Sequence, residues 1–127
     1  MTRRLLILLL TGLCCVCAQN PPPTPSTHTL RLTFSYDFRI TPACSKKVQE
    51  RCVQQFNFYD ISQGPDKRVK LGSIPAKPGA KKLEKAISGT SDPQVFSPGR
   101  HRVAVAAQLS DGRESDVRLC SVVVTIP

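Results

Sequence analysis

One stretch of eleven residues, 30–40, constrains the fold more than any other part of the sequence. Its large apolar and aromatic residues alternate with polar ones, and they are Leu30, Leu32, Phe34, Tyr36, Phe38 and Ile40. Successive side chains of a β-strand point to opposite faces of a sheet, so this alternation predicts a strand with one apolar face. A strand of this length would span about 36 Å. Because most strands are shorter, we expect a bulge or bend within it.

The other segments with a two-residue period supply surfaces that can cover this face. We expect strands over 53–61, 67–71, 83–87, 101–109 and 117–126, although 81–87 also fits a helical turn. Turn signals separate them, including Gly64-Pro65, Pro98-Gly99 and Asp111-Gly112, and the last of these predicts a hairpin. No segment has a sustained helical period. The sequence therefore predicts an all-β fold, a single antiparallel β-sandwich of about six or seven strands over 29–127.

The first 18 residues have the parts of a secretory signal peptide. Arg3 and Arg4 precede an apolar run over 5–10, and small residues at Val16 and Ala18 suit cleavage after Ala18. A membrane anchor would need roughly 20 apolar residues, more than this run provides. We expect a secreted, extracellular protein with no transmembrane segment, in which residues 19–28 form a Pro-rich flexible lead or a poor edge strand.

Charge narrows the class of partner. The full chain carries a formal net charge of +9, which falls to +7 when Arg3 and Arg4 leave with the leader. A basic secreted protein favours anionic partners such as sulfated glycans, anionic lipid surfaces or acidic proteins. Nucleic acid is not expected as a partner of an exported chain.

A family resemblance emerges in the second half of the chain. The residues that carry it are Phe96-x-Pro98-Gly99, followed by Val103-x-Val105-x-Ala107, Asp111-Gly112-x-x-Ser115 and a valine-rich final strand. This pattern resembles a fibronectin type III module and, more broadly, immunoglobulin-like sandwiches. The chain has no tryptophan, and His101 stands where the inward parity would place the family's corner tyrosine. We expect the His101 ring to make a comparable hydrogen bond to nearby backbone.

Three cysteines remain after removal of the leader: Cys44, Cys52 and Cys120. In an oxidising compartment an odd number implies one disulfide and one leftover thiol. Chain entropy assigns about 2.5 kcal/mol to a bridge between Cys44 and Cys52 and about 4.5 kcal/mol to one between Cys52 and Cys120. Proximity in the chain favours the first, with Cys120 free or an alternative partner. The apolar parity of Cys120 favours a buried free thiol over a bridge between two copies of the chain.

No motif indicates catalysis or metal binding. The sequence lacks HExxH, CxxC, a Gly-rich phosphate loop and Gly-x-Ser-x-Gly, and the cysteine and histidine spacings match no tight zinc-ligand pair. We expect no enzymatic activity, no cofactor and no metal.

Two groups of residues are candidates for binding. Basic residues of the first group fit an anion-binding segment: Lys67, Arg68, Lys70, Lys81, Lys82 and Lys85. Lysines on an exposed strand edge also prevent edge-to-edge aggregation, which is the alternative interpretation. The second group lies on loops expected at one end of the sandwich: Lys46, Lys47, Arg51, Asp111 and Arg113. The leading hypothesis is a non-catalytic module that binds an extracellular protein. The alternative is a cationic protein of host-defence type that binds glycosaminoglycan or anionic surfaces.

Overall fold

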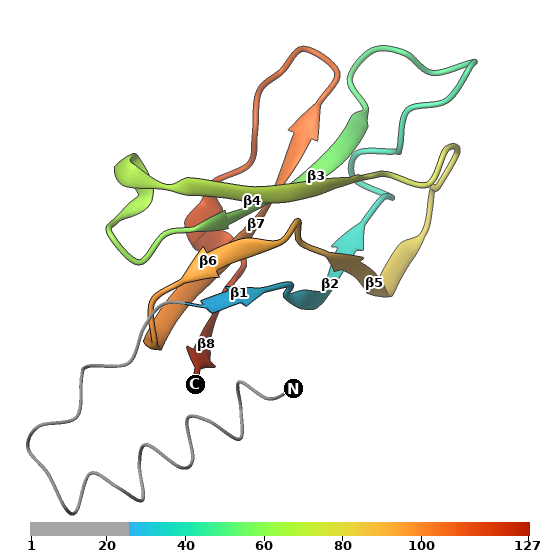
Figure 1. Cartoon of the computed structure of the whole chain (residues 1–127). Helices are drawn as coiled ribbons and strands as arrows, with labels where there is room; N and C mark the ends of the chain where they lie inside the picture. The colour runs from blue at the N-terminus through green and yellow to red at the C-terminus, as the bar shows by residue number, and fades with distance from the viewer. Residues whose placement is uncertain (1–25) are drawn as a thin grey trace, which may run out of the picture.

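The computed structural model describes residues 26–127, so the expected signal peptide and the lead over 19–25 lie outside the described residues. The described chain is all-β and contains no α-helix. Its strands are β1 (Ser26–His28), β2 (Arg31–Asp37), β3 (Val53–Asp60), β4 (Val69–Pro75), β5 (Leu83–Thr90), β6 (Gln94–Phe96), β7 (Gly99–Leu109) and β8 (Ser121–Ile126). Two 3₁₀ turns, η1 (Pro65–Lys67) and η2 (Val117–Leu119), complete the elements (Figure 1).

All strand pairs that form the sheets are antiparallel. One sheet has four strands in the order β4-β3-β7-β8, and two smaller sheets pair β2 with β5 and β1 with β6. The small sheets lie below β3 and β4 in the view of Figure 1, so the molecule has two layers. The expected antiparallel all-β architecture is confirmed, and the short strands β1 and β6 are additional to the six strand segments predicted. One of these, β1, covers the last three residues of the expected lead.

The core lies between the layers and is built around the predicted aromatic face. Its buried members are Leu32, Phe34, Phe38, Ala43, Val53, Phe56, Phe58, Leu71, Ala76, Phe96, Val103, Ala107 and Ile126. The ring of Phe34 packs edge-on at a centroid distance of 4.9 Å from Phe56 and 6.2 Å from Phe58. Edge-to-face packing brings the positive ring edge to a negative ring face, which adds to the stabilisation from burial.

The opening strand is shorter than predicted. A register shift between Phe34 and Tyr36 supplies the expected irregularity, but β2 ends at Asp37. There the carboxylate accepts hydrogen bonds from the backbone and side chain of Arg39, and the chain turns. Ile40 is consequently 81% exposed, so its expected place on the apolar face is wrong.

The basic strand also departs from prediction. We expected Val69 and Leu71 on one inward face, yet Leu71 is buried whereas Val69 is 56% exposed. A register shift opposite Phe58 and Tyr59 leaves Leu71 as an extra residue, and Val69 lies at the strand end opposite the polar Asp60.

The connection from β7 to β8 contains the predicted hairpin but is longer than a simple turn. The amide of Gly112, which has φ +92°, donates to Leu109 O, and the amide of Leu109 donates to Arg113 O. The chain then leaves the sheet through η2 and rejoins β7 where Val105 N donates to Cys120 O. The last strand therefore begins at Ser121, not at the predicted Val117.

Candidate functional site

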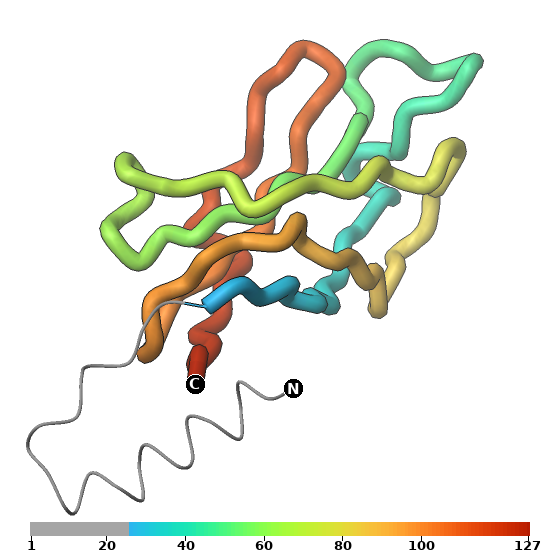
Figure 2. The backbone as a smooth tube through the Cα atoms, viewed as in Figure 1, coloured from blue at the N-terminus to red at the C-terminus, as the bar shows by residue number. Residues whose placement is uncertain are grey.

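Two loops lie side by side at one end of the molecule. A disulfide joins Cys44 to Cys52 across the first loop, with a Cα–Cα separation of 4.9 Å, as the chain spacing favoured. The amide of Ser110, at the start of the second loop, donates to Cys52 O at 2.9 Å. Figure 2 shows both loops projecting beyond the strands at the same end. The bridge thus fixes the first loop directly beside the hairpin over 109–115.

The loops bring together most of the predicted loop-end residues. Arg51, Asp111 and Arg113 line one open hollow of about 340 Å³. Lys46 and Lys47 line a neighbouring hollow of about 530 Å³ on the disulfide loop. Within the first hollow, Asp111 accepts from Arg113 Nε at 2.7 Å, so these two charges are paired. No ion pair is found for Arg51 in the described part of the chain.

A buried polar network holds the base of the hairpin. Oε2 of Glu114 accepts from Tyr59 Oη at 2.7 Å and from Asn57 Nδ2 at 2.7 Å. Asn57 is only 1% exposed, and its Nδ2 also donates to Gln108 Oε1. Burying such groups is costly unless they are paired, so the network holds Glu114, at the base of the hairpin, against β3.

The network shifts the pKa of both ionisable groups at its centre. Burial, and then the hydrogen bond to Glu114, raise the pKa of Tyr59 to about 12. Burial alone would raise the pKa of Glu114, but hydrogen bonds from Tyr59 and Asn57 and the nearby positive charge of Arg68 lower it below its ordinary value. Glu114 is therefore an anion at neutral pH and accepts both hydrogen bonds as a carboxylate.

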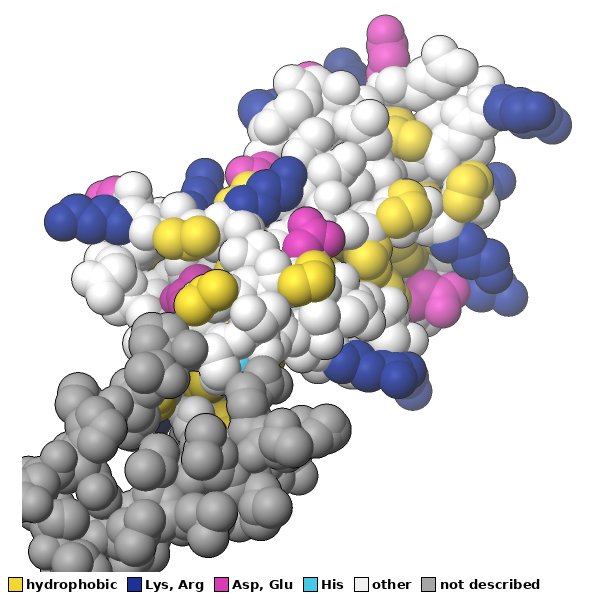
Figure 3. All heavy atoms as spheres, viewed as in Figure 1, with side chains coloured by type: hydrophobic (Ala, Val, Ile, Leu, Met, Phe, Trp, Pro, Cys, Tyr) yellow, Lys and Arg dark blue, Asp and Glu magenta, His cyan; other side chains and the backbone are white. Residues whose placement is uncertain are grey.

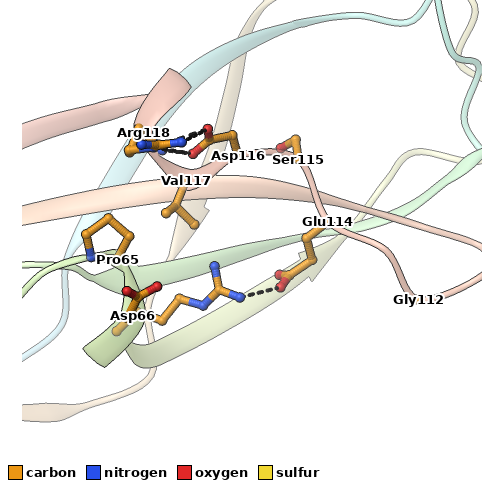
Figure 4. Close-up of a pocket in the computed structure, with 9 residues that line it drawn as sticks. Pro65, Asp66, Gly112, Glu114, Ser115, Asp116, Val117 and Arg118 are labelled. Atoms are coloured by element: carbon orange, nitrogen blue, oxygen red, sulfur yellow. Dashed lines mark hydrogen bonds and ion pairs between the residues drawn. The ribbon is translucent and has the colours of Figure 1, made fainter.

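A third hollow, of about 810 Å³, lies on the other side of the hairpin between η1 and η2 (Figure 4). Arg68 Nη2 lies 3.5 Å from Glu114 Oε1, and its guanidinium lies 4.9 Å from the centre of the Tyr59 ring. Arg118 forms an ion pair with Asp116 at 2.7 Å. The charged groups of this hollow are thus held largely by one another.

Sequence reasoning missed the buried role of Glu114, and it missed Asp116 and Arg118. A signal for part of this set was present, because an aspartate followed two residues later by arginine occurs at Asp37, Asp111 and Asp116. In each case the carboxylate accepts from the backbone amide and from the side chain of that arginine. This local turn neutralises three of the arginines.

The two basic segments lie at opposite ends of β4. Lys67 ends η1 and Arg68 follows it, whereas Lys81 and Lys82 follow the far end of the strand, in the loop before β5 (Figure 1). On the face drawn in Figure 3, the basic side chains lie at separated points and do not form one patch. Arg68 is engaged by Glu114, whereas Lys70, Lys81, Lys82 and Lys85 have no ion pair within residues 26–127.

Cys120 and His101 occupy different environments. Cys120 is free and exposed, so its predicted burial is wrong. The smaller layer does not cover this end of the last strand, where Val122 is also 52% exposed. Partial desolvation still raises the pKa of the Cys120 thiol.

The His101 ring lies between two oxygen atoms. Nε2 lies 2.8 Å from Ser97 O, which is the expected hydrogen bond to backbone, and Nδ1 lies 2.9 Å from Asp60 Oδ2.

Within residues 26–127, no cluster of three or more histidine, cysteine, aspartate or glutamate side chains is arranged to hold a metal ion. The same residues include no helix long and apolar enough to cross a bilayer. Comparison of the chain with protein-family models, curated proteins and solved structures found no match.

Proposed function

We propose that the protein is a secreted, non-catalytic β-sandwich module of the fibronectin type III or immunoglobulin-like kind that binds another extracellular protein. The two-layer arrangement supports the fold assignment, since the four-stranded sheet β4-β3-β7-β8 faces the pair β2-β5 across one core. The Pro98-Gly99 corner leads directly into the long strand β7, as the resemblance implies. The bridge between Cys44 and Cys52 fits an oxidising compartment.

The hairpin over 109–115 carries the assignment of a binding surface. Three hollows adjoin it, lined in turn by Gly112 and Glu114, by Arg113 and Ser115, and by Ser110 and Asp111. The hairpin projects from the molecule, so a partner could contact its tip and also insert side chains into the hollows beside it. Glu114 fixes the base of the hairpin, so the hairpin would lose little conformational entropy when a partner binds.

Substitutions at opposite ends of β7 test this surface. Arg113 lies just beyond Leu109 at one end, and exposed Arg100 lies at the other end, about 30 Å away along the strand. Extracellular partners are captured by proximity labelling with the secreted protein, and their affinity is then measured for the Arg51→Ala/Arg113→Ala and Arg100→Ala variants. We expect at least a tenfold loss for the first variant and none for the second. Equal affinities would remove the hairpin as the binding surface.

The cationic alternative has its own observation. Lys81, Lys82 and Lys85 follow one another closely and have no ion pair in the described chain, in contrast to Arg68. These lysines, and not Arg68, are therefore the residues to test for sulfated glycans. Heparin elution is compared between a variant with these three lysines changed to alanine and a Lys46→Ala/Lys47→Ala/Arg51→Ala variant. Both variants lose three positive charges, so a difference between them reports a local site. Equal decreases in the salt concentration at which they elute would mean that net charge alone determines binding. A larger decrease for the variant at Lys81, Lys82 and Lys85 would support a site there.

A further inference from the structure

Among residues 26–127, the outer edge of β8 is the least protected strand edge. β8 ends the order β4-β3-β7-β8, and no strand among residues 26–127 pairs with its outer side. Its sequence, Ser-Val-Val-Val-Thr-Ile, has no charge and no proline. Every other described edge strand longer than three residues contains charged residues: β2, β4 and β5. An uncharged edge rich in β-branched residues is a template for pairing with another strand.

The hydrogen-bond pattern shows which groups this edge offers. Val105 N donates to Cys120 O, and Val103 is opposite Val122, so even-numbered residues of β8 direct their backbone groups toward β7. The alternate residues Ser121, Val123 and Thr125 therefore direct their N–H and C=O groups outward. Ser121, Val122 and Thr125 are exposed, Val123 and Val124 are half-buried, and Ile126 is buried in the core. Three donors and three acceptors thus lie along an uncovered, apolar edge.

We propose that β8 pairs antiparallel with β8 of a second copy of the chain, across a twofold axis at Val123. This register places Val123 opposite Val123 and Ser121 opposite Thr125, so outward groups meet outward groups. All three residues of each copy then exchange both hydrogen bonds, about six in total. Val122 also comes opposite Val124, which is a favourable pair of branched side chains. The strand is therefore complementary to itself.

Electrostatics permits this pairing. The nearest like charges are Arg100 and Arg102 on β7, opposite Thr125 and Val123. Arg102 Nη1 donates to Ser121 Oγ at 3.1 Å, and in the dimer the two Ser121 residues lie four residues apart along neighbouring strands, about 14 Å. That distance exceeds the Debye length of about 8 Å at physiological ionic strength, so the repulsion is largely screened.

Two other occupants of the edge fit less well. Residues 19–25 contain Pro21, Pro22, Pro23 and Pro25, which lack the amide hydrogen that a ladder requires. A disulfide between the two copies of Cys120 is incompatible with the register, because the two Cys120 Cα atoms lie about 20 Å apart along the paired strands. Disulfides need a Cα separation of roughly 4.4–6.8 Å. The dimer is therefore non-covalent.

Sedimentation equilibrium of the secreted protein tests the proposal. A Cys120→Ser background removes adventitious bridges without reducing the Cys44–Cys52 bond. The proposed interface consists of one pair of six-residue strands and is small, so we expect a dimer with a dissociation constant on the order of 10 μM to 1 mM. Thr125→Lys puts a charge on the exposed edge and should weaken dimerisation at least tenfold. Val123→Pro removes an outward amide hydrogen without removing a donor to β7, and it should do the same.

Val95→Lys is the matched control, since Val95 is 69% exposed on β6 and lies outside β8. In the Cys120→Ser background it should dimerise with the same dissociation constant as the protein without the lysine. If the Cys120→Ser protein is a monomer at every concentration, the proposal is overturned. This holds even if the protein that retains Cys120 dimerises, because that dimer would be joined by a disulfide. Undiminished dimerisation of Thr125→Lys, or equal loss in Val95→Lys, would also overturn it, because the interface would then lie elsewhere.

Discussion

The hydroxyl of Tyr59 donates a hydrogen bond of 2.7 Å to Oε2 of Glu114, across 55 residues of sequence. This contact joins β3 to the base of the hairpin over 109–115. The same carboxylate oxygen accepts from Asn57 at 2.7 Å, so one anion orders two buried donors. The candidate binding surface therefore depends on a network inside the molecule as well as on the exposed hairpin residues.

Removal of the carboxylate should destabilise the protein. Glu114→Ala leaves Tyr59, 8% exposed, without its acceptor and takes one of two acceptors from Asn57. A buried donor without a partner costs about 1–3 kcal/mol, and we expect a loss of that size in the free energy of unfolding measured with urea. The control is Glu50→Ala, an exposed carboxylate that should change stability by less than about 0.5 kcal/mol. Equal effects of the two changes would contradict a structural role for the network.

The raised pKa of Tyr59 predicts loss of stability at high pH. Because the folded-state pKa is about 12 and the ordinary value is 10.0, the folded protein holds this proton more tightly than the unfolded chain does. The stabilisation is complete below about pH 10 and is lost as the pH rises toward 12. The chain has two tyrosines, so a Tyr36→Phe variant leaves Tyr59 as the sole phenol for ultraviolet titration. A midpoint near 10 in the folded protein would contradict the prediction.

The strands and the core could be predicted because their signals are local. Alternation in residues 30–40 placed Leu32, Phe34 and Phe38 in the core, where the structure has them. Ile40 has the same parity but is exposed, because the Asp37 carboxylate turns the chain before it. Phe38 lies one residue beyond β2 but still donates to Lys82 O on the neighbouring segment, so alternation predicts faces only as far as this pairing continues.

The candidate site could be predicted only in part. The order of strands and loops was enough to bring Arg51 near Asp111 and Arg113. The sequence around Glu114 does not identify its role, because Asn57 and Tyr59 lie more than 50 residues away. Cys120 was misplaced for a related reason: its parity indicates the core face, but the opposing layer does not reach it.

Gly89 should tolerate no side chain. A Cβ atom at this position would lie 2.7 Å from Phe58 Cζ and 2.9 Å from two side-chain carbons of Ile74. Phe58 is fully buried, so its ring has little room to shift. We expect Gly89→Ala to lower the free energy of unfolding by about 1–3 kcal/mol through overpacking. Its neighbour Ser88 is exposed, and Ser88→Ala should change stability by less than about 0.5 kcal/mol. Similar stabilities for the two variants would contradict the close approach of the layers at Gly89.

The disulfide should contribute both stability and the geometry of the first loop. Chain entropy gives about 2.5 kcal/mol for a loop of this length, so Cys44→Ser/Cys52→Ser should lose about that amount. Arg51, beside the bridge, has a φ of +53°, an unfavourable conformation for a non-glycine residue, and should leave it when the bridge is absent. Nuclear magnetic resonance of the Arg51 amide should then show averaging, while Cys120→Ser leaves its signal unchanged. Among the cysteines of residues 26–127, alkylation without reductant should label Cys120 and neither Cys44 nor Cys52. A bridge that includes Cys120 would contradict the arrangement of the loop end.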